Sequence, residues 1–113
     1  MAAWKLTSRK GSEVARESFD DLEQALAELR RHAYVAVAEG PRSRVSALRD
    51  FEPADQVVAR LEISGRGILR APTAGIDVMG DGSLVPFSGS VRREVLTPQR
   101  PGDEFDAVRR ALS

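Results

Sequence analysis

The chain has 113 residues, with 17 basic and 17 acidic side chains and no cysteine. This length suits one apolar core, so we expect residues 1–113 to form a single domain. A net charge near zero argues against a general nucleic-acid binder, and the absence of cysteine excludes disulfides, thiolate zinc sites and thiol catalysis. With neither a signal sequence nor a membrane span in view, the cytoplasm is the expected location.

The chain begins with the pattern of a β-hairpin. Trp4–Arg9 alternates in polarity like a strand, the pair Gly11-Ser12 indicates a turn, and Glu13–Ser18 returns as a second strand.

The register of this hairpin has two solutions. A two-residue loop pairs Lys10 with Glu13 and Trp4 with Phe19, whereas a three-residue loop pairs Arg9 with Glu13. Both solutions place opposite charges across from each other, so charge pairing favours a hairpin without selecting the register.

A helix is expected after the hairpin. Asp20 opens it, with Glu23 three residues later as in a capping box, and Gly40-Pro41 stops it. The segment Ala33–Ala38 has strand propensity, yet it continues the helical phase and is assigned to the helix. The apolar stripe consists of Leu22, Leu26, Leu29, Ala33 and Val37.

Two strands follow, over Arg44–Phe51 and Gln56–Ser64, and Gly65–Pro72 has the composition of a loop. The second strand has one apolar and one mostly charged face, which is typical of a half-buried antiparallel strand. Its apolar face is Val57, Ala59, Leu61 and Ile63, and its other face is Val58, Arg60 and Glu62.

The stretch AGIDVMGDGSLVPFSG, residues 74–89, has two interpretations. As a calcium loop beginning at Asp77, it would place Met79 at position 3 and Ser88 at position 12, where an oxygen ligand and a bidentate glutamate are needed. We therefore interpret it as a hairpin and expect no metal site.

In the hairpin interpretation, Asp81-Gly82 forms a two-residue turn between a strand ending near Gly80 and a long strand from Leu84. One apolar face then lies beneath the helices. Its predicted pairs are Val78 with Val85 and Ile76 with Phe87, and Val91 and Val95 continue it.

A short helix is expected at the end of the chain, after a proline-containing linker. Acidic residues in its first turn and basic residues in its last turn complement the helix dipole. The acidic residues are Asp103, Glu104 and Asp106, the basic ones Arg109 and Arg110, and the buried stripe Phe105, Val108 and Leu112.

Together these elements predict an α+β fold: an antiparallel sheet of about six strands, in the order ββαββββα, with two helices packed on one face.

No catalytic set is visible in the sequence. His32, the single histidine, has no recognisable nucleophile or orienting acid beside it, so we interpret it as a surface or boundary residue. The Gly65-Arg66-Gly67 run lacks the third glycine and the strand-to-helix context of a dinucleotide fingerprint. We expect no catalytic residues and no cofactor.

Two groups of polar residues are candidates for binding. Arg66, Arg70 and Arg92 could hold an anion, although arginines in loops are usually solvated. A polar sheet face could form an interaction surface, although surface ion pairs need no function to explain them. That face carries Arg60, Glu62 and Asp77, joined by Ser88, Ser90, Arg92 and Glu94.

Three runs carry a resemblance: ESFDDLEQALAELRR (Glu17–Arg31), DFEPADQVVARLEISG (Asp50–Gly65) and GIDVMGDGSLVPFSGSVRRE (Gly75–Glu94). Together they resemble a group of small bacterial proteins of about this length, over most of the chain. The shared motifs are a helix start, a strand and a hairpin. Because no activity is assigned to the group, the resemblance implies no catalytic residues.

These observations favour a non-enzymatic binding or assembly module that self-associates as a homodimer. The alternative is a binding protein or enzyme for a small anionic ligand, held by Arg66, Arg70 and Arg92. Neither nucleic acid nor a membrane is expected as a partner.

Overall fold

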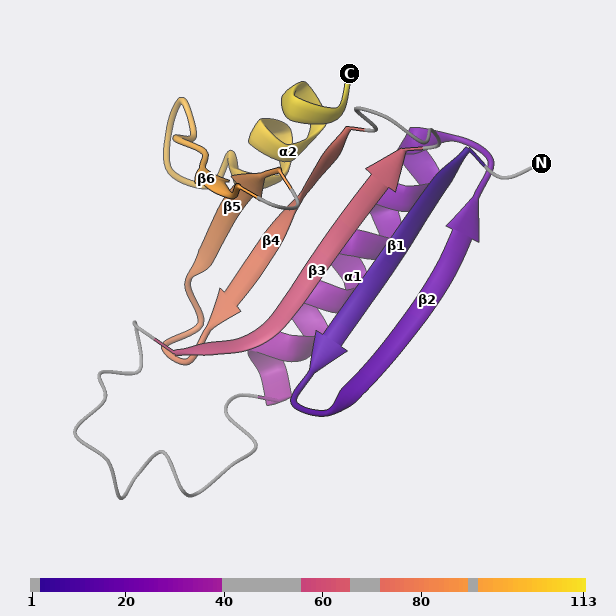
Figure 1. The fold of residues 1–113 in the computed structure, drawn as a ribbon. Helices are drawn as coiled ribbons and strands as arrows, with labels where there is room; N and C mark the ends of the chain where they lie inside the picture. Colours follow the sequence, from indigo (N-terminus) through magenta and orange to yellow (C-terminus); the bar gives the residue numbers. More distant parts are fainter. Residues whose placement is uncertain (1–2, 40–55, 66–71, 90–91) are drawn as a thin grey trace.

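A computed structural model describes residues 3–39, 56–65, 72–89 and 92–113, which form one antiparallel sheet with two helices on one of its faces (Figure 1). This arrangement confirms the α+β prediction and its ββαββββα order. Helix α1 is Leu22–Glu39 and helix α2 is Glu104–Leu112. The strands are β1 Trp4–Lys10, β2 Glu13–Phe19, β3 Val57–Gly65, β4 Thr73–Met79, β5 Leu84–Ser88 and β6 Glu94–Val95.

The sheet order is β2-β1-β3-β4-β5-β6, and every neighbouring pair is antiparallel. The core lies between the sheet and the helices. Its largest fully buried side chains are Leu6, Leu29, Leu61, Ile63, Ile76, Val78 and Val108. Within the described ranges, no helix combines the length and the apolar character needed to cross a membrane.

The first hairpin adopts the two-residue loop. Lys10 pairs with Glu13 and Trp4 with Phe19, and Gly11 takes a left-handed φ of 60° in the turn. This register decides which side chains of β1 and β2 share a face.

Helix α1 begins one residue later than predicted. The Asp21 carboxylate accepts a hydrogen bond from the Gln24 backbone N–H at 2.8 Å, so Asp21, and not Asp20, caps the first turn. The helix then continues through Ala33–Ala38, as predicted. The alanine Ala36 faces the core, whereas Val37, predicted for the stripe, is exposed.

The second hairpin has a three-residue loop, which corrects the predicted two-residue turn. Met79 N–H donates to the Ser83 carbonyl and Gly82 N–H to the Met79 carbonyl, both at 2.9 Å. Gly82 takes a φ of 88°, as expected when a left-handed residue closes a turn of this length. The Asp81 carboxylate accepts the Ser83 backbone N–H at 2.9 Å and so stabilises this loop.

The extra loop residue shifts the register by one. Because strand side chains alternate between faces, such a shift moves a whole strand's pattern to the other side. Phe87 therefore faces Gly75 and not Ile76, and Val78 faces Leu84 and not Val85. The prediction that Phe87 and Val85 lie beneath the helices is wrong, whereas Ile76 and Val78 do lie in the core.

The long strand predicted from Leu84 to Val95 is interrupted. Gly89 takes a φ of 89°, and its N–H donates to the Thr73 carbonyl, so the chain turns there. Short strand β6 then folds back against β5 and pairs Val95 with Phe87. The prediction that Val95 continues the face beneath the helices is therefore wrong, and Val95 is exposed. The predicted strand Arg44–Phe51, the predicted position of Val91 and most of the Gly65–Pro72 loop lie outside the described residues. Helix α2 buries the predicted stripe.

Candidate functional site: the open face of the sheet

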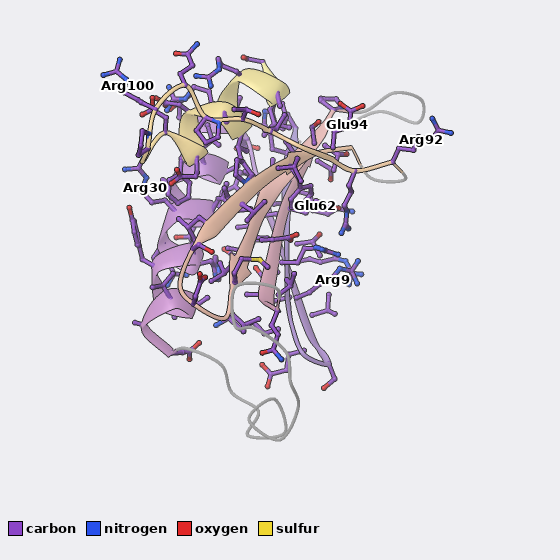
Figure 2. All side chains as sticks on the ribbon, turned by 90° about the vertical axis from the view of Figure 1, so that its left-hand side faces the viewer. Arg9, Arg30, Glu62, Arg92, Glu94 and Arg100 are labelled. Atoms are coloured by element: carbon purple, nitrogen blue, oxygen red, sulfur yellow. The ribbon has the colours of Figure 1, made fainter. Side chains whose placement is uncertain are left out.

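Both helices pack on one side of the sheet, and the opposite side is not covered by either (Figure 1). Figure 2 shows Arg9, Glu62 and Arg92 on this open side, and Arg30 and Arg100 on the helix side. Strand registers and contacts assign eight residues to what we call the cationic face. They are Lys5, Arg9, Arg16, Arg60, Glu62, Asp77, Phe87 and Arg93.

An aromatic ring lies beneath guanidinium groups on this face. Phe87 is only 2% exposed although no helix covers it. The Cζ atoms of Arg93 and Arg60 lie 5.0 Å and 5.9 Å from the centre of its ring, within the range of cation–π attraction. Gly75 is the direct cross-strand partner of Phe87. The ring is thus sheltered by the stems and heads of charged side chains.

One arginine of the face is held in place by a carboxylate. Arg60 donates from Nε to Asp77 Oδ1 at 2.7 Å and from Nη2 to Asp77 Oδ2 at 2.9 Å, a bidentate contact between directly paired residues of β3 and β4. This hydrogen bonding raises the pKa of Arg60 above its ordinary value. The contact between Arg93 and Glu62 is looser, at 3.5 Å.

Three other cations of the face differ from Arg60 and Arg93. Arg9 lies directly opposite Arg60 across β1 and β3, and Arg16 lies opposite Thr7, which Lys5 and Arg9 flank along β1. Among the described residues, none of these three cations forms an ion pair. With five cations and two carboxylates, the face is net positive although the whole chain is neutral.

The predicted interaction surface is assembled in part. Arg60 and Glu62 lie together with Asp77, as the alternation of β3 predicts. Glu94 pairs with Ser88, whose own partner on β4 is the core residue Ala74, so the register places both on the other side from Phe87.

The predicted anion-binding residues are not brought together within the described part of the chain. Arg92 is exposed, and Figure 2 shows its side chain extending away from the sheet. Arg66, Arg70 and Ser90 lie outside the described residues.

Sequence reasoning missed the cations of the first hairpin. Arg9 and Arg16 share a face in the two-residue register, whereas the three-residue register would place them on opposite faces. The signal was present in the alternation of Lys5, Thr7 and Arg9, but it could be used only once the loop length was known.

A second polar cluster lies between β2 and α1. His32, interpreted from the sequence as a surface or boundary residue, is 17% exposed at its side chain, and its Nε2 atom lies 2.9 Å from Glu17 Oε1 and 3.5 Å from Glu28 Oε2. The histidine thus has two carboxylate neighbours, from a strand and from its own helix.

Comparisons with protein-family models, with curated proteins and with solved structures return no match to this chain. The resemblance to a group of small bacterial proteins therefore stays a prediction, and the candidate site is argued from its own geometry.

Proposed function

We propose that the chain is a non-enzymatic binding module, and that its cationic face docks an acidic segment of a partner protein. The observation that supports this most is the placement of Arg9 opposite Arg60. Like charges directly opposite each other destabilise a sheet. Among the described residues, Arg60 has a carboxylate that offsets the repulsion, whereas Arg9 forms no ion pair. An arrangement that lowers the stability of the fold, such as this pair of arginines, is expected where a residue serves binding.

An acidic protein segment fits this face better than a phosphate backbone does. Glu62 and Asp77 lie among the cations, so a continuous row of phosphates would meet two carboxylates. A polypeptide can alternate acidic with neutral or basic residues and avoid them. The neutral charge of the whole chain also gives little long-range attraction to a nucleic acid.

The homodimer predicted from the sequence is the second form of this proposal, and it has two electrostatic obstacles. Two copies joined through the cationic face would bring net positive surfaces together. Two copies could also pair antiparallel along the β2 edge, with the two-fold axis near the middle of the strand. An axis at Arg16 would place Arg16 against its own copy, and an axis one residue earlier would place Glu13 against Glu17, so like charges meet in both cases. We therefore favour a different, acidic partner.

Fluorescence anisotropy with a labelled alternating glutamate–alanine copolymer, the acidic peptide, at about 0.15 M salt tests the proposal. We expect the double variant Arg9→Thr/Arg16→Thr to bind about tenfold more weakly than the wild type, a loss of about 1.4 kcal/mol. The matched control is Arg100→Gln/Arg110→Gln, which removes the same charge from exposed positions of the α2 region. The control should bind like the wild type.

Three results would overturn the proposal in this form. Equal losses in the double variant and in its control would mean that binding follows net charge alone. Tighter binding to a DNA oligonucleotide than to the acidic peptide would make the partner a nucleic acid. A dimer in light scattering that the double variant dissociates would make the partner a second copy of the chain.

A further inference from the structure

The cluster between β2 and α1 brings together three side chains with metal-ligand chemistry. Glu28 and His32 are four residues apart and so lie on the same side of α1. Glu17 comes from β2, where it pairs with the fully buried Leu6 and therefore faces the helices. The fold thus joins a strand carboxylate to a helix carboxylate and an imidazole.

The distances in this cluster suit a small cation. One ligand atom from each of Glu17, Glu28 and His32 can be chosen so that all three lie within 4.8 Å of one another. His32 Nε2 lies 2.9 Å from Glu17 Oε1 and 3.5 Å from Glu28 Oε2. Zinc bonds nitrogen and oxygen at about 2.0–2.2 Å, so ligand atoms around a tetrahedral ion are roughly 3.3 Å apart.

We propose that Glu17, Glu28 and His32 bind one divalent transition-metal ion of the zinc class, with a fourth position open to water. The imidazole nitrogen favours zinc, nickel and copper, whereas magnesium and calcium prefer ligand sets made of oxygen alone. Three protein ligands with one open position is the pattern of zinc sites that exchange their fourth ligand. The ion would connect the edge hairpin to α1.

Arg31 is an internal competitor for this site. It donates from Nε and Nη2 to the two oxygens of Glu28 at 2.8 Å and 2.9 Å, and its Nη2 lies 3.5 Å from His32 Nε2. The same contact lowers the pKa of Glu28. Because the Arg31 side chain is 58% exposed, it can move into solvent when an ion binds.

This competition separates a metal site from a simple ion-pair network. If the cluster serves only as a network, removing Arg31 removes a partner and creates no preference for zinc. If it is a metal site, removing Arg31 frees Glu28 and strengthens zinc binding. The two interpretations therefore predict different outcomes for the same substitution.

Competition of the protein against a chromogenic chelator for zinc chloride tests the proposal, with the chain freed of any polyhistidine tag. We expect one zinc ion per chain. His32→Gln and Glu17→Gln should each weaken binding by at least about tenfold, because even outer-shell changes at metal sites have effects of that size. Arg31→Gln should bind several-fold more tightly. The matched control, Glu23→Gln, removes an exposed carboxylate of α1 outside the cluster and should change nothing.

Thermal unfolding of the same variants checks that each is folded and gives a second readout. Zinc should raise the melting temperature of the wild type and of Glu23→Gln, but not that of His32→Gln. The proposal is overturned if His32→Gln binds zinc as tightly as the wild type, if magnesium competes equally with zinc, or if the wild type does not take up one ion.

Discussion

Each face of the sheet buries a large apolar side chain, but by different means. On the helix side, Ile76 and Val78 are completely buried by the apolar side chains of α1, α2 and the neighbouring strands. On the open side, Phe87 is almost as buried, but the groups nearest its ring include the guanidinium heads of Arg60 and Arg93. Burial alone therefore does not identify the core of this protein.

The faces also differ in how their charges are balanced. On the helix side, Lys10 pairs with Glu39, and Arg109 with Glu23. On the open side, Arg9 faces another arginine. The cations named on the helix side are thus paired, whereas the open side keeps positive charge that has no partner among the described residues. This difference is the basis for the binding function proposed above, and the predictions below test it.

The largest effect on stability is expected at Gly75, where the backbones of β3 and β4 approach closely. A Cβ atom on Gly75 would lie 1.9 Å from the Leu61 carbonyl oxygen on the neighbouring strand. Gly75→Ala should force β3 and β4 apart and lower the free energy of unfolding by at least about 3 kcal/mol, measured by urea denaturation. A loss below about 1 kcal/mol would show that the strands can adjust.

The next effect compares a phenylalanine from each face. Phe87→Ala, on the open side, should lower the free energy of unfolding by about 3 kcal/mol, the lower end of the range for removal of a core phenylalanine. Phe105→Ala in α2, which belongs to the core cluster, is the matched control. If Phe87→Ala lowers the free energy of unfolding much less than the control does, guanidinium groups shelter an aromatic ring less effectively than apolar side chains do.

A smaller effect separates the two ion pairs of the open face. A double-mutant cycle with Arg60→Gln and Asp77→Asn should give a coupling of about 1 kcal/mol, because the contact is bidentate and partly buried. The same cycle with Arg93→Gln and Glu62→Gln should give a coupling near zero, because that contact is long. Equal couplings would mean that geometry does not distinguish the pairs.

The smallest effect concerns the loop that assigns Phe87 to the open face. Hydrogen bonds from the Ser83 hydroxyl and backbone N–H lower the pKa of Asp81. A lowered folded-state pKa contributes stability above the unfolded pKa, near 4, that is lost as the pH falls through the folded value. Asp81→Ala should therefore be less stable than the wild type at pH 7, and the difference should disappear near pH 2. A difference that persists in acid would exclude the carboxylate as its source.

The sequence predicts the helix side of this fold well, because apolar periodicity follows directly from burial. The strand alternation of Ala59, Leu61 and Ile63 and the α2 stripe are both found in the core. The prediction fails for Val57, which is predicted to lie on the same strand face but is exposed, because the register of β3 shifts between Val57 and Ala59. Apolar periodicity also correctly predicted that α1 includes Ala33–Ala38, although the local sequence there has strand propensity.

The open side was harder to predict, because it depends on loop length. The pair Asp81-Gly82 suits both a two-residue turn and the observed three-residue loop, and glycine satisfies the left-handed position in each. The loop length decides which face carries Phe87, and the three-residue loop places Phe87 on the open face. The sequence also left the register of the first hairpin undecided. It therefore did not show that Arg9 and Arg16 lie on one face of the sheet. Predicting the contact between Glu17 and His32 requires knowing how α1 is rotated and positioned over β2. No local sequence pattern gives that information.

The central claim, that Arg9 is kept for binding at the expense of stability, is tested most directly by urea unfolding of the wild type and Arg9→Thr, each with and without the alternating glutamate–alanine copolymer, a polyanion. Without the polyanion, we expect the variant to be more stable by about 0.5 kcal/mol, because the repulsion with Arg60 is removed. With it, the wild type should gain more stability than the variant. A variant that is less stable alone, or that gains equally from the polyanion, would contradict the account.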